Sequence, residues 1–475
     1  TDMQIQSRQF KQNASRAVAD EQLQQSLLNV KKGLVNNRLN AVRLVSDFEQ
    51  MREQASKLKK HTLRHLDYYL EEFEKNYTAR GGQIHWASTP EEACKIVTDI
   101  CQSHNAKTVA KGKSMVGEEI GINEALDQIG IEPIETDLGE YIIQLAQESP
   151  SHIIVPCVHK TRKQIIDLFY QNHKQYGCDT MLSDVPGLVA EARKIMRSKF
   201  LDADIGMTGA NFLVAETGST VIVTNEGNGD LCSTLPKVHI ALAGIEKVVP
   251  GLDDVSLLTR LLARSATGQE TTAYTTFTTG PKRTADIDGP EEMHLVMVDN
   301  GRTELLGSEI SEILRCIRCG ACMNHCPVYG TVGGHAYGWV YPGPMGSVLT
   351  PAIQGLEEAG DLPNACTLNG RCETVCPVKI HLPRLLRQLR VRQFKKRLGS
   401  RVSRFYLSVW SQLVKRPVIY HGLNNVAVRL LKLIGMKKGS LKHLPLAGGW
   451  MKSRDFPVPQ GKTFHEQWKQ QREKQ

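Results

Sequence analysis

Seven of the twelve cysteines of this 475-residue chain lie within one stretch of 61 residues. Residues 316–327 follow the spacing C-x2-C-x2-C-x3-C-P, and three further cysteines stand at Cys366, Cys372 and Cys376. Three thiolates on one tight turn can hold three irons of a [4Fe-4S] cluster, and the fourth cysteine of such a run binds the other cluster where a chain holds two. A structural zinc ion is the alternative, but zinc is usually held by cysteine pairs around one tetrahedral centre. The spacing therefore predicts iron-sulfur clusters.

The same spacing divides the seven thiolates between two clusters in a crossed manner. We expect cluster one to be held by Cys316, Cys319, Cys322 and Cys376, and cluster two by Cys326, Cys366 and Cys372. Asn369 stands where the first run has a cysteine, so cluster two has three evident thiolates. Cluster two is then a [3Fe-4S] cluster, a [4Fe-4S] cluster with one iron on water or on Asn369, a cluster completed from elsewhere, or absent.

The clusters point to electron transfer rather than to a complete enzyme. Cysteine-bound iron without a substrate position moves single electrons, whereas two-electron chemistry normally needs a flavin or a nicotinamide. The chain has no G-x-G-x-x-G after a strand-like run and no P-loop. We therefore expect a subunit whose partner supplies such a cofactor, unless the rest of the chain binds one.

Four segments are expected to position these residues. Residues 1–80 repeat apolar positions at helical spacing, which predicts an N-terminal helical extension. In residues 81–300, short β-branched runs such as TVA, PIET, HIIVP and VHIALAG alternate with helix-length stretches such as EEIGINEALDQI, which predicts an α/β domain with a mainly parallel sheet. Residues 301–385 are rich in cysteine, glycine and proline and predict a small two-cluster domain. Residues 386–475 predict a tail of basic amphipathic helices.

Positive charge is concentrated in the tail. From Arg384 onward there are 22 lysines and arginines against three acidic residues, a net charge of +19, while the rest of the chain carries −10. This tail could contact an acidic partner, the body of the protein or an anionic membrane. Nucleic acid is not expected, because no nucleic-acid-binding motif accompanies the charge. Because no run of about 18 apolar residues and no signal peptide is present, we expect a cytoplasmic protein, with peripheral contact to the inner face of the membrane as an option.

Several runs resemble a known family, the lactate-utilization iron-sulfur protein B family. They include GANFLVAETGSTVIVTNEGN, LPKVHIALAGIEKVVP and GGHAYGWVYPGPMGSVLTP, and the resemblance extends over nearly the whole chain. It implies an α/β lactate-utilization (LUD) domain, similar in fold to sugar-phosphate isomerases and CoA transferases, followed by a two-cluster ferredoxin-type domain. The family pattern has four cysteines in each motif, so Asn369 is a departure from it.

The resemblance also implies a function. It points to a subunit of a complex that oxidises L-lactate to pyruvate without NAD, together with a cysteine-rich iron-sulfur subunit and a second LUD-domain subunit. Electrons would pass through the two clusters to an acceptor such as quinone. The alternatives are a LUD-domain enzyme acting on a small organic acid or phosphosugar, with structural or redox-sensing clusters, and a scaffold that only assembles the complex.

Three polar, glycine-rich segments could form a ligand site in the α/β domain. They are residues 111–114 (KGKS), 216–219 (ETGS) and 226–229 (EGNG). Ligands of parallel sheets sit beyond the carboxyl ends of strands, where a small carboxylate such as lactate would fit. These glycines could equally serve tight turns. His152, His159 and His239 could accept a proton or pack as structural residues, and His325 is expected to tune hydrogen bonding near a cluster sulfur.

Overall fold

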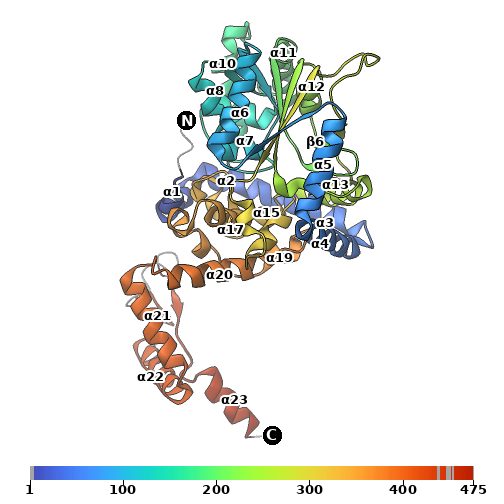
Figure 1. Cartoon of the computed structure of the whole chain (residues 1–475). Coiled ribbons are helices and arrows are strands. Elements are labelled where there is room, and N and C mark those ends of the chain that lie inside the picture. The colour runs from blue at the N-terminus through green and yellow to red at the C-terminus, as the bar shows by residue number, and fades with distance from the viewer. Residues whose placement is uncertain (1–4, 436–438, 445–450, 452–453, 474–475) are drawn as a thin grey trace. The chain divides into compact units, whose positions relative to one another are not determined.

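The computed structural model describes residues 5–435, 439–444, 451 and 454–473. Two compact units are present, Thr1–Arg392 and Gln393–Gln475. Figure 1 traces both along the chain. Residues 1–392 form a single unit, so this division does not test the boundaries between the four segments expected from the sequence. Those boundaries remain a prediction.

The chain opens with helices that serve two different parts of the first unit. They are η1 (Ser7–Gln9), α1 (Phe10–Ala19), α2 (Glu21–Val30), the π-helical η2 (Lys31–Val35), α3 (Asn36–Arg43), α4 (Phe48–Arg64) and α5 (Leu66–Ala79). Met51 and Ala55 of α4 are buried in the core that also contains the cluster cysteines. Phe73 and Tyr77 of α5 are instead buried against the central sheet. The N-terminal helices therefore pack on both the cysteine-rich region and the α/β region.

A six-stranded sheet forms the centre of the α/β region, and all of its strand pairs are parallel. Its order is β1 (Gln83–Ala87), β10 (Glu292–Val298), β7 (Val238–Gly244), β4 (Ile205–Gly209), β2 (Thr108–Lys111) and β3 (Glu132–Glu135). A smaller sheet runs β8 (Val248–Val249), β5 (Phe212–Val214), β6 (Ser219–Thr224) and β9 (Tyr274–Thr278), with antiparallel pairs on both sides of β6. Every residue of β7 is buried, as expected for a strand covered on both faces. The predicted mainly parallel sheet is confirmed.

Helices connect the strands. They are α6 (Pro90–Ser103), α7 (Met115–Ile120), α8 (Ile122–Gln128), α9 (Leu138–Ala146), α10 (Arg162–Asn172), η3 (His173–Tyr176), α11 (Val185–Leu201), α12 (Asn228–Thr234), η4 (Ile245–Lys247) and α13 (Leu252–Ala266). The stretch EEIGINEALDQI is divided between α7 and α8 because Gly121 adopts φ of 72°, a left-handed conformation that ends one helix and begins the next.

The run HIIVP, expected as a strand, is instead a bend, so this prediction was wrong. The ring of His152 explains the bend, because its Nδ1 accepts hydrogen bonds from the backbone N–H groups of Ile154 and Val155 at 3.0 and 3.1 Å. These donors are therefore unavailable to a strand ladder. The buried Ile153 packs in the core that contains the cluster cysteines. Long-range packing thus overrides the local β-branched pattern.

The cysteine-rich region consists of short helices and loops. These helices are α14 (Arg302–Leu305), η5 (Ser311–Arg315), α15 (Ala321–Asn324), α16 (Tyr329–Val332), η6 (His335–Tyr337), α17 (Gly343–Ile353), α18 (Leu356–Ala359), η7 (Leu362–Asn364), α19 (Arg371–Val375) and α20 (Leu382–Lys395). Its buried side chains belong to one hydrophobic core with residues of α1, α4 and α13. The region has no separate core and depends on the N-terminal helices.

The second unit contains α21 (Arg401–Val414), α22 (Pro417–Gly435), β11 (Ser440–Leu441), β12 (Phe456–Pro457) and α23 (Phe464–Arg472). Its helices expose large apolar side chains, including Phe405 and Trp410, which are 65% and 57% exposed. Across the described part of the chain, none of the helices combines the length and the apolar character needed to cross a bilayer.

A buried ion-pair network joins the sheet to the cysteine-rich region. Arg302 is fully buried, with Nη2 at 2.7 Å from Glu119 Oε2 and Nε at 2.7 Å from Glu246 Oε2. Tyr341 also donates its hydroxyl to Glu119, and Arg318 of the first cysteine loop lies 3.4 Å from Glu246. Burial raises the pKa of Glu119, but the Arg302 charge and hydrogen bonds outweigh it and hold the pKa below its usual value. The network therefore holds charged partners in the interior.

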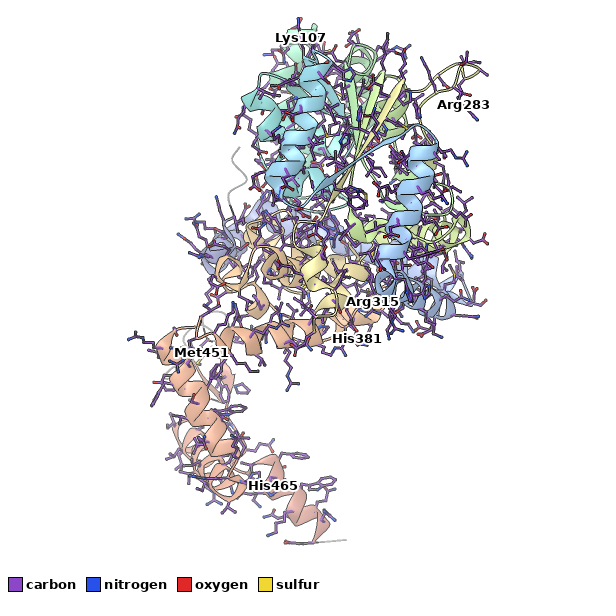
Figure 2. All side chains as sticks on the ribbon, in the orientation of Figure 1. Lys107, Arg283, Arg315, His381, Met451 and His465 are labelled. Carbon is purple, nitrogen blue, oxygen red and sulfur yellow. The ribbon has the colours of Figure 1, made fainter. Side chains whose placement is uncertain are left out.

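Replacing the central arginine should destabilise the fold. Arg302→Met leaves Glu119 and Glu246 buried without their main counter-charge, and we expect the free energy of unfolding to fall by about 3–5 kcal/mol. Urea unfolding followed by circular dichroism measures this loss. Arg283→Met is the matched control, because Arg283 pairs only at the surface with Asp286, on the long loop between β9 and β10 (Figure 2). Equal stability of the two variants would contradict a structural role for the network.

Candidate metal centre

The first cysteine loop contains two left-handed residues. Arg318 has φ of 58° and Gly320 has φ of 73°, and α15 begins directly after them. The backbone N–H of Arg318 donates to Cys316 Sγ at 3.4 Å. A side chain at Gly320 would meet the ring of His152, whose Cε1 lies 3.3 Å from the position of a Cβ atom. The loop is thus tightly coiled and closely covered by the bend at residues 152–156.

The sulfurs of this loop share one cavity with a cysteine from the second motif. The cavity is lined by Cys316, Cys319, Cys322 and Cys376 and by the apolar side chains of Ile153, Ile317, Met345, Val378, Ile380 and Leu382. The structure thus brings together the four cysteines expected to hold cluster one. Their role as ligands remains a prediction. Burial raises the pKa of the Cys376 thiol to about 11, and coordination to iron would stabilise the thiolate.

The three cysteines expected to hold cluster two also come together. Burial, and then the nearby thiols of Cys366 and Cys326, raise the pKa of Cys372 to about 12. Burial and the thiol of Cys366 likewise raise the pKa of Cys326. The two cysteine motifs therefore exchange one cysteine each: Cys376 joins the first group, and Cys326 joins the second. Ligation of a second cluster by these residues also remains a prediction.

The second loop repeats the backbone of the first. Leu368 and Gly370 have φ of 56° and 80°, and the N–H of Leu368 donates to Cys366 Sγ at 3.2 Å. Asn369 therefore occupies the place that Cys319 has in the first loop. Its side chain is exposed, and its Oδ1 accepts a hydrogen bond from the backbone N–H of Arg371 at 3.0 Å, in the first turn of α19. Asn369 is engaged with the backbone of α19.

The spacing of the sulfurs does not suit zinc. Four sulfurs bound to one tetrahedral zinc ion lie about 3.8 Å apart. Where three or more potential ligand atoms lie within 4.8 Å of one another in the described residues, the groups consist of histidine and carboxylate side chains, without cysteine. The cysteine sulfurs are thus spaced more widely here than around one zinc ion, and a larger iron-sulfur core remains the prediction.

An unpartnered hydroxyl also fits such a core. Tyr337 is 1% exposed, and its hydroxyl oxygen has no hydrogen-bond partner among the described residues. Burial raises the pKa of Tyr337, and the thiols of Cys326, Cys366 and Cys322 add to this effect, so the hydroxyl lies near both cysteine groups. A buried hydroxyl without a partner is costly, whereas a cluster sulfur would accept its hydrogen bond. Nothing in the cysteine spacing points to Tyr337, although it lies in the GGHAYGWVYPGP run between the motifs.

The polar segments of the LUD region are only partly brought together. Residues 111–114 and 226–229 meet at the carboxyl end of β2, where Gly229 Cα lies 3.6 Å from the Cβ position of Gly112. Lys111 is fully buried between Glu118 and Glu135 at 2.8 and 2.7 Å. Lys113 Nζ lies 3.5 Å from Glu140. Since both lysines already face carboxylates, the expected pocket for a small carboxylate is not supported.

The third segment forms a turn, which agrees with the alternative that these glycines serve tight turns. Residues 216–219 connect β5 to β6, and Gly218 has φ of 64°. A Cβ atom at Gly218 would lie 2.4 Å from the backbone nitrogen of Tyr77 in α5. Close approach of α5 therefore accounts for this glycine.

The four histidines that were considered as site residues from the sequence form hydrogen bonds with other protein groups. His152 Nε2 lies 2.9 Å from Asn324 Oδ1, and His239 Nε2 lies 2.9 Å from Thr208 Oγ1. Burial lowers the pKa of both rings to about 4. His159 lies between Ser151 Oγ and Glu148 at 2.7 and 2.8 Å. His325 Nδ1 lies 3.0 Å from the carbonyl oxygen of Ala321.

Models of three families match consecutive parts of the chain. A LUD domain matches residues 70–298, a 4Fe-4S dicluster domain matches residues 312–380, and the model described as lactate utilisation protein B, C-terminal, matches residues 387–473. The predicted fold class, a LUD domain followed by a two-cluster domain, is confirmed by these matches and by the parallel sheet.

Curated relatives extend over almost the whole chain. An uncharacterized electron transport protein, YkgF of Escherichia coli (strain K12), is 41% identical over 461 residues, covering 97% of this chain and 96% of that protein. Lactate utilization protein B of Bacillus cytotoxicus is 41% identical over 471 residues, covering 98% of each chain. The protein of that name from Bacillus thuringiensis (strain Al Hakam) is also 41% identical, over 470 residues and 98% of each chain.

One solved structure is similar to part of the chain. The crystal structure of a DUF162 family protein from Deinococcus radiodurans covers 49% of this chain and 98% of its own, at 14% identity and a TM-score of 0.26. The curated relatives and the three family models together show that this chain belongs to the lactate utilization protein B family of iron-sulfur proteins.

Proposed function

We propose that this protein is the iron-sulfur electron-transfer subunit of a complex that oxidises L-lactate to pyruvate, in which two clusters supply one-electron carriers toward an acceptor such as quinone. The oxidation releases two electrons and two protons, and because each cluster carries one electron, the two electrons would reach the acceptor one at a time. Support comes from the family, whose members carry the names lactate utilization protein B and electron transport protein.

One observation carries the proposal: the exchange of cysteines between the two motifs. Cys376 of the second motif lines the cavity of the first, and Cys326 of the first motif lies with Cys366 and Cys372. This arrangement would hold two carriers next to each other on one rigid scaffold. Tyr337 lies near thiols of both groups and would donate a hydrogen bond to a cluster sulfur.

The surroundings of the two groups differ. Around the first group, apolar side chains such as Ile317, Met345 and Ile380 exclude water. Around the second, residues 367–369 are exposed, and Asn369 bonds to the backbone of α19. We therefore propose that cluster two is held by three thiolates only, as a [3Fe-4S] cluster or as a [4Fe-4S] cluster with one iron on a non-protein ligand.

Partners are proposed on the same basis. We expect a cysteine-rich iron-sulfur subunit and a second LUD-domain subunit to complete the complex. The exposed apolar side chains of α21 and α22, together with the +19 charge of residues 384–475, suit docking onto an acidic subunit or an anionic membrane at the cytoplasmic face.

A LUD-domain enzyme is the second candidate. Burial, only partly offset by Lys113, raises the pKa of Glu140 to about 8, so this carboxyl could act as an acid or a base near neutral pH. Glu140 lies in the first turn of α9, which follows the carboxyl end of β3. This function does not need electron flow through the cysteine-rich region.

Removing one thiolate separates the two candidates. Cys319→Ala should abolish lactate-dependent reduction of an acceptor by the assembled complex and change the EPR spectrum of cluster one, because that cluster would lose a ligand. Cys178→Ala, which changes a cysteine outside both motifs, is the control. Full turnover in a folded Cys319→Ala protein would instead favour the LUD-domain enzyme. Clusters that never change oxidation state during turnover would favour a scaffold.

Restoring the missing cysteine tests the ligation of cluster two. We expect Asn369→Cys to raise the iron content of air-exposed protein by about one atom per chain and to remove the three-iron EPR signal, since a fourth thiolate retains the labile iron. Asn369→Ala is the control, because it removes the hydrogen bond to α19 without adding a ligand. Identical spectra and iron contents for the wild type and Asn369→Cys would show that cluster two is complete or absent.

Removing one hydroxyl tests the position of Tyr337. Tyr337→Phe should lower the potential of at least one cluster by about 20–60 mV, because a hydrogen bond of about 0.5–1.5 kcal/mol to the more negative reduced state is lost. An EPR-monitored redox titration measures the shift. Tyr329→Phe is the matched control, since the Tyr329 hydroxyl donates to the carbonyl oxygen of Ser151 at 2.8 Å. Unchanged potentials in Tyr337→Phe would rule out a contact with a cluster.

A further inference from the structure

Three potential metal ligands meet at the amino end of the parallel sheet. His104 directly follows α6, while Glu292 and His294 lie two residues apart on β10. Residues i and i+2 of a strand point to the same face. That face is covered by α6, because Val97 and Ile100 pack in one core with Val296. The helix and the strand therefore bring the three side chains together, although His104 and Glu292 are far apart in the sequence.

The distances match those around a single metal ion. His104 Nε2 lies 3.4 Å from Glu292 Oε2, and His294 Nε2 lies 3.5 Å from the same oxygen. The three ligand atoms all lie within 4.8 Å of one another. Ligands at 2.0–2.1 Å from a tetrahedral zinc ion are separated by about 3.3–3.4 Å. The observed spacing is longer than a good hydrogen bond and close to that value.

The buried histidine is oriented as a ligand would be. His294 Nδ1 lies 3.1 Å from His85 Nε2, so the second histidine fixes the ring from behind. Its other nitrogen, Nε2, is buried and has no hydrogen-bond partner among the described residues, while the residue is only 5% exposed. Burial and then the neighbouring His85 lower the pKa of His294, which favours the neutral ring that metal binding requires.

A second group of similar composition is satisfied without a metal. Glu148, His159 and His335 also lie within 4.8 Å of one another. Lys160 pairs with Glu148, both nitrogens of His159 have protein partners, and His335 Nε2 donates to the carbonyl oxygen of Ser149 at 2.7 Å. The charge of Lys160 would also repel a cation. Protein hydrogen bonds and an ion pair therefore account for this second group.

We propose that His104, Glu292 and His294 bind a divalent transition-metal ion, with zinc as the best match to the donor set and spacing. Two imidazoles and one carboxylate are common zinc ligands and leave a fourth position for water. Solvent reaches this position, because the side chains of His104 and Glu292 are 29% and 45% exposed. The site ties the end of α6 to the beginning of β10. It is independent of the proposed electron transfer.

The site lies away from the cysteines, so zinc bound there can be distinguished from zinc bound to sulfur. Figure 2 shows Lys107, three residues after His104 and directly before β2, at the end of the LUD domain that faces away from the cysteine-rich region. Full-length protein with its clusters assembled is incubated with zinc chloride, freed of loosely bound metal and analysed by mass spectrometry and zinc-edge X-ray absorption. We expect one zinc per chain, with nitrogen and oxygen neighbours at about 2.0–2.1 Å and no sulfur at about 2.3 Å.

Variants assign the metal to these residues. His104→Gln should lose at least tenfold in zinc affinity and abolish the rise of the thermal midpoint that zinc causes in the wild type. His294→Gln should behave alike, and His104→Gln carries the test if the buried variant does not fold. His159→Gln, in the second group, is the control and should retain zinc. The proposal is overturned by a sulfur shell around zinc, by substoichiometric zinc in the wild type, or by undiminished binding in His104→Gln.

Discussion

The cysteine-rich region depends on one constraint, namely that each predicted cluster takes thiols from both cysteine motifs. Cys376 must reach the first loop, and Cys326 must reach the second, before either group of sulfurs is complete. Burial raises the pKa of Cys326, Cys372 and Cys376, so binding of iron would release protons from these thiols. We therefore expect assembly of the clusters to be coupled to closure of the region. The short helices between the motifs share one hydrophobic core with residues of α1, α4 and α13.

A second interior feature links this region to the sheet. Arg302 follows β10 and holds both Glu119 of α7 and Glu246 of η4, while Arg318 and Tyr341 approach the same carboxylates from the cysteine-rich region. Such a network is costly to break at a single point, because each remaining charge would be buried without a partner. The LUD domain is thereby fixed against the first cysteine loop. His152 adds a further contact, between the backbone of its own bend and Asn324.

Local patterns predicted the parts of the structure that local physics controls. Cysteine spacing predicted that Cys316, Cys319 and Cys322 come together, because the left-handed residues at Arg318 and Gly320 coil the loop within a few residues. β-branched runs predicted the parallel sheet, since buried strands need continuous apolar sequence. The run HIIVP failed because the ring of His152 takes the N–H groups that a strand would use. The group around His294 had no signal in the sequence, since its ligands are set by the packing of α6 on β10.

The two cysteine loops show how one substitution can separate two otherwise equivalent sites. Their backbones agree at both left-handed positions and in the hydrogen bond to the leading cysteine, so the second loop has the same local shape as the first. At the position of the missing thiol, Cys319 is 7% exposed, whereas Asn369 is exposed and engages the backbone of α19. A missing thiolate ligand is better tolerated where water can reach the iron. An iron lacking a thiolate needs another oxygen or nitrogen ligand, and only the exposed loop can supply one from solvent. A substitution at Cys319 would leave the corresponding iron in an apolar cavity without a replacement ligand.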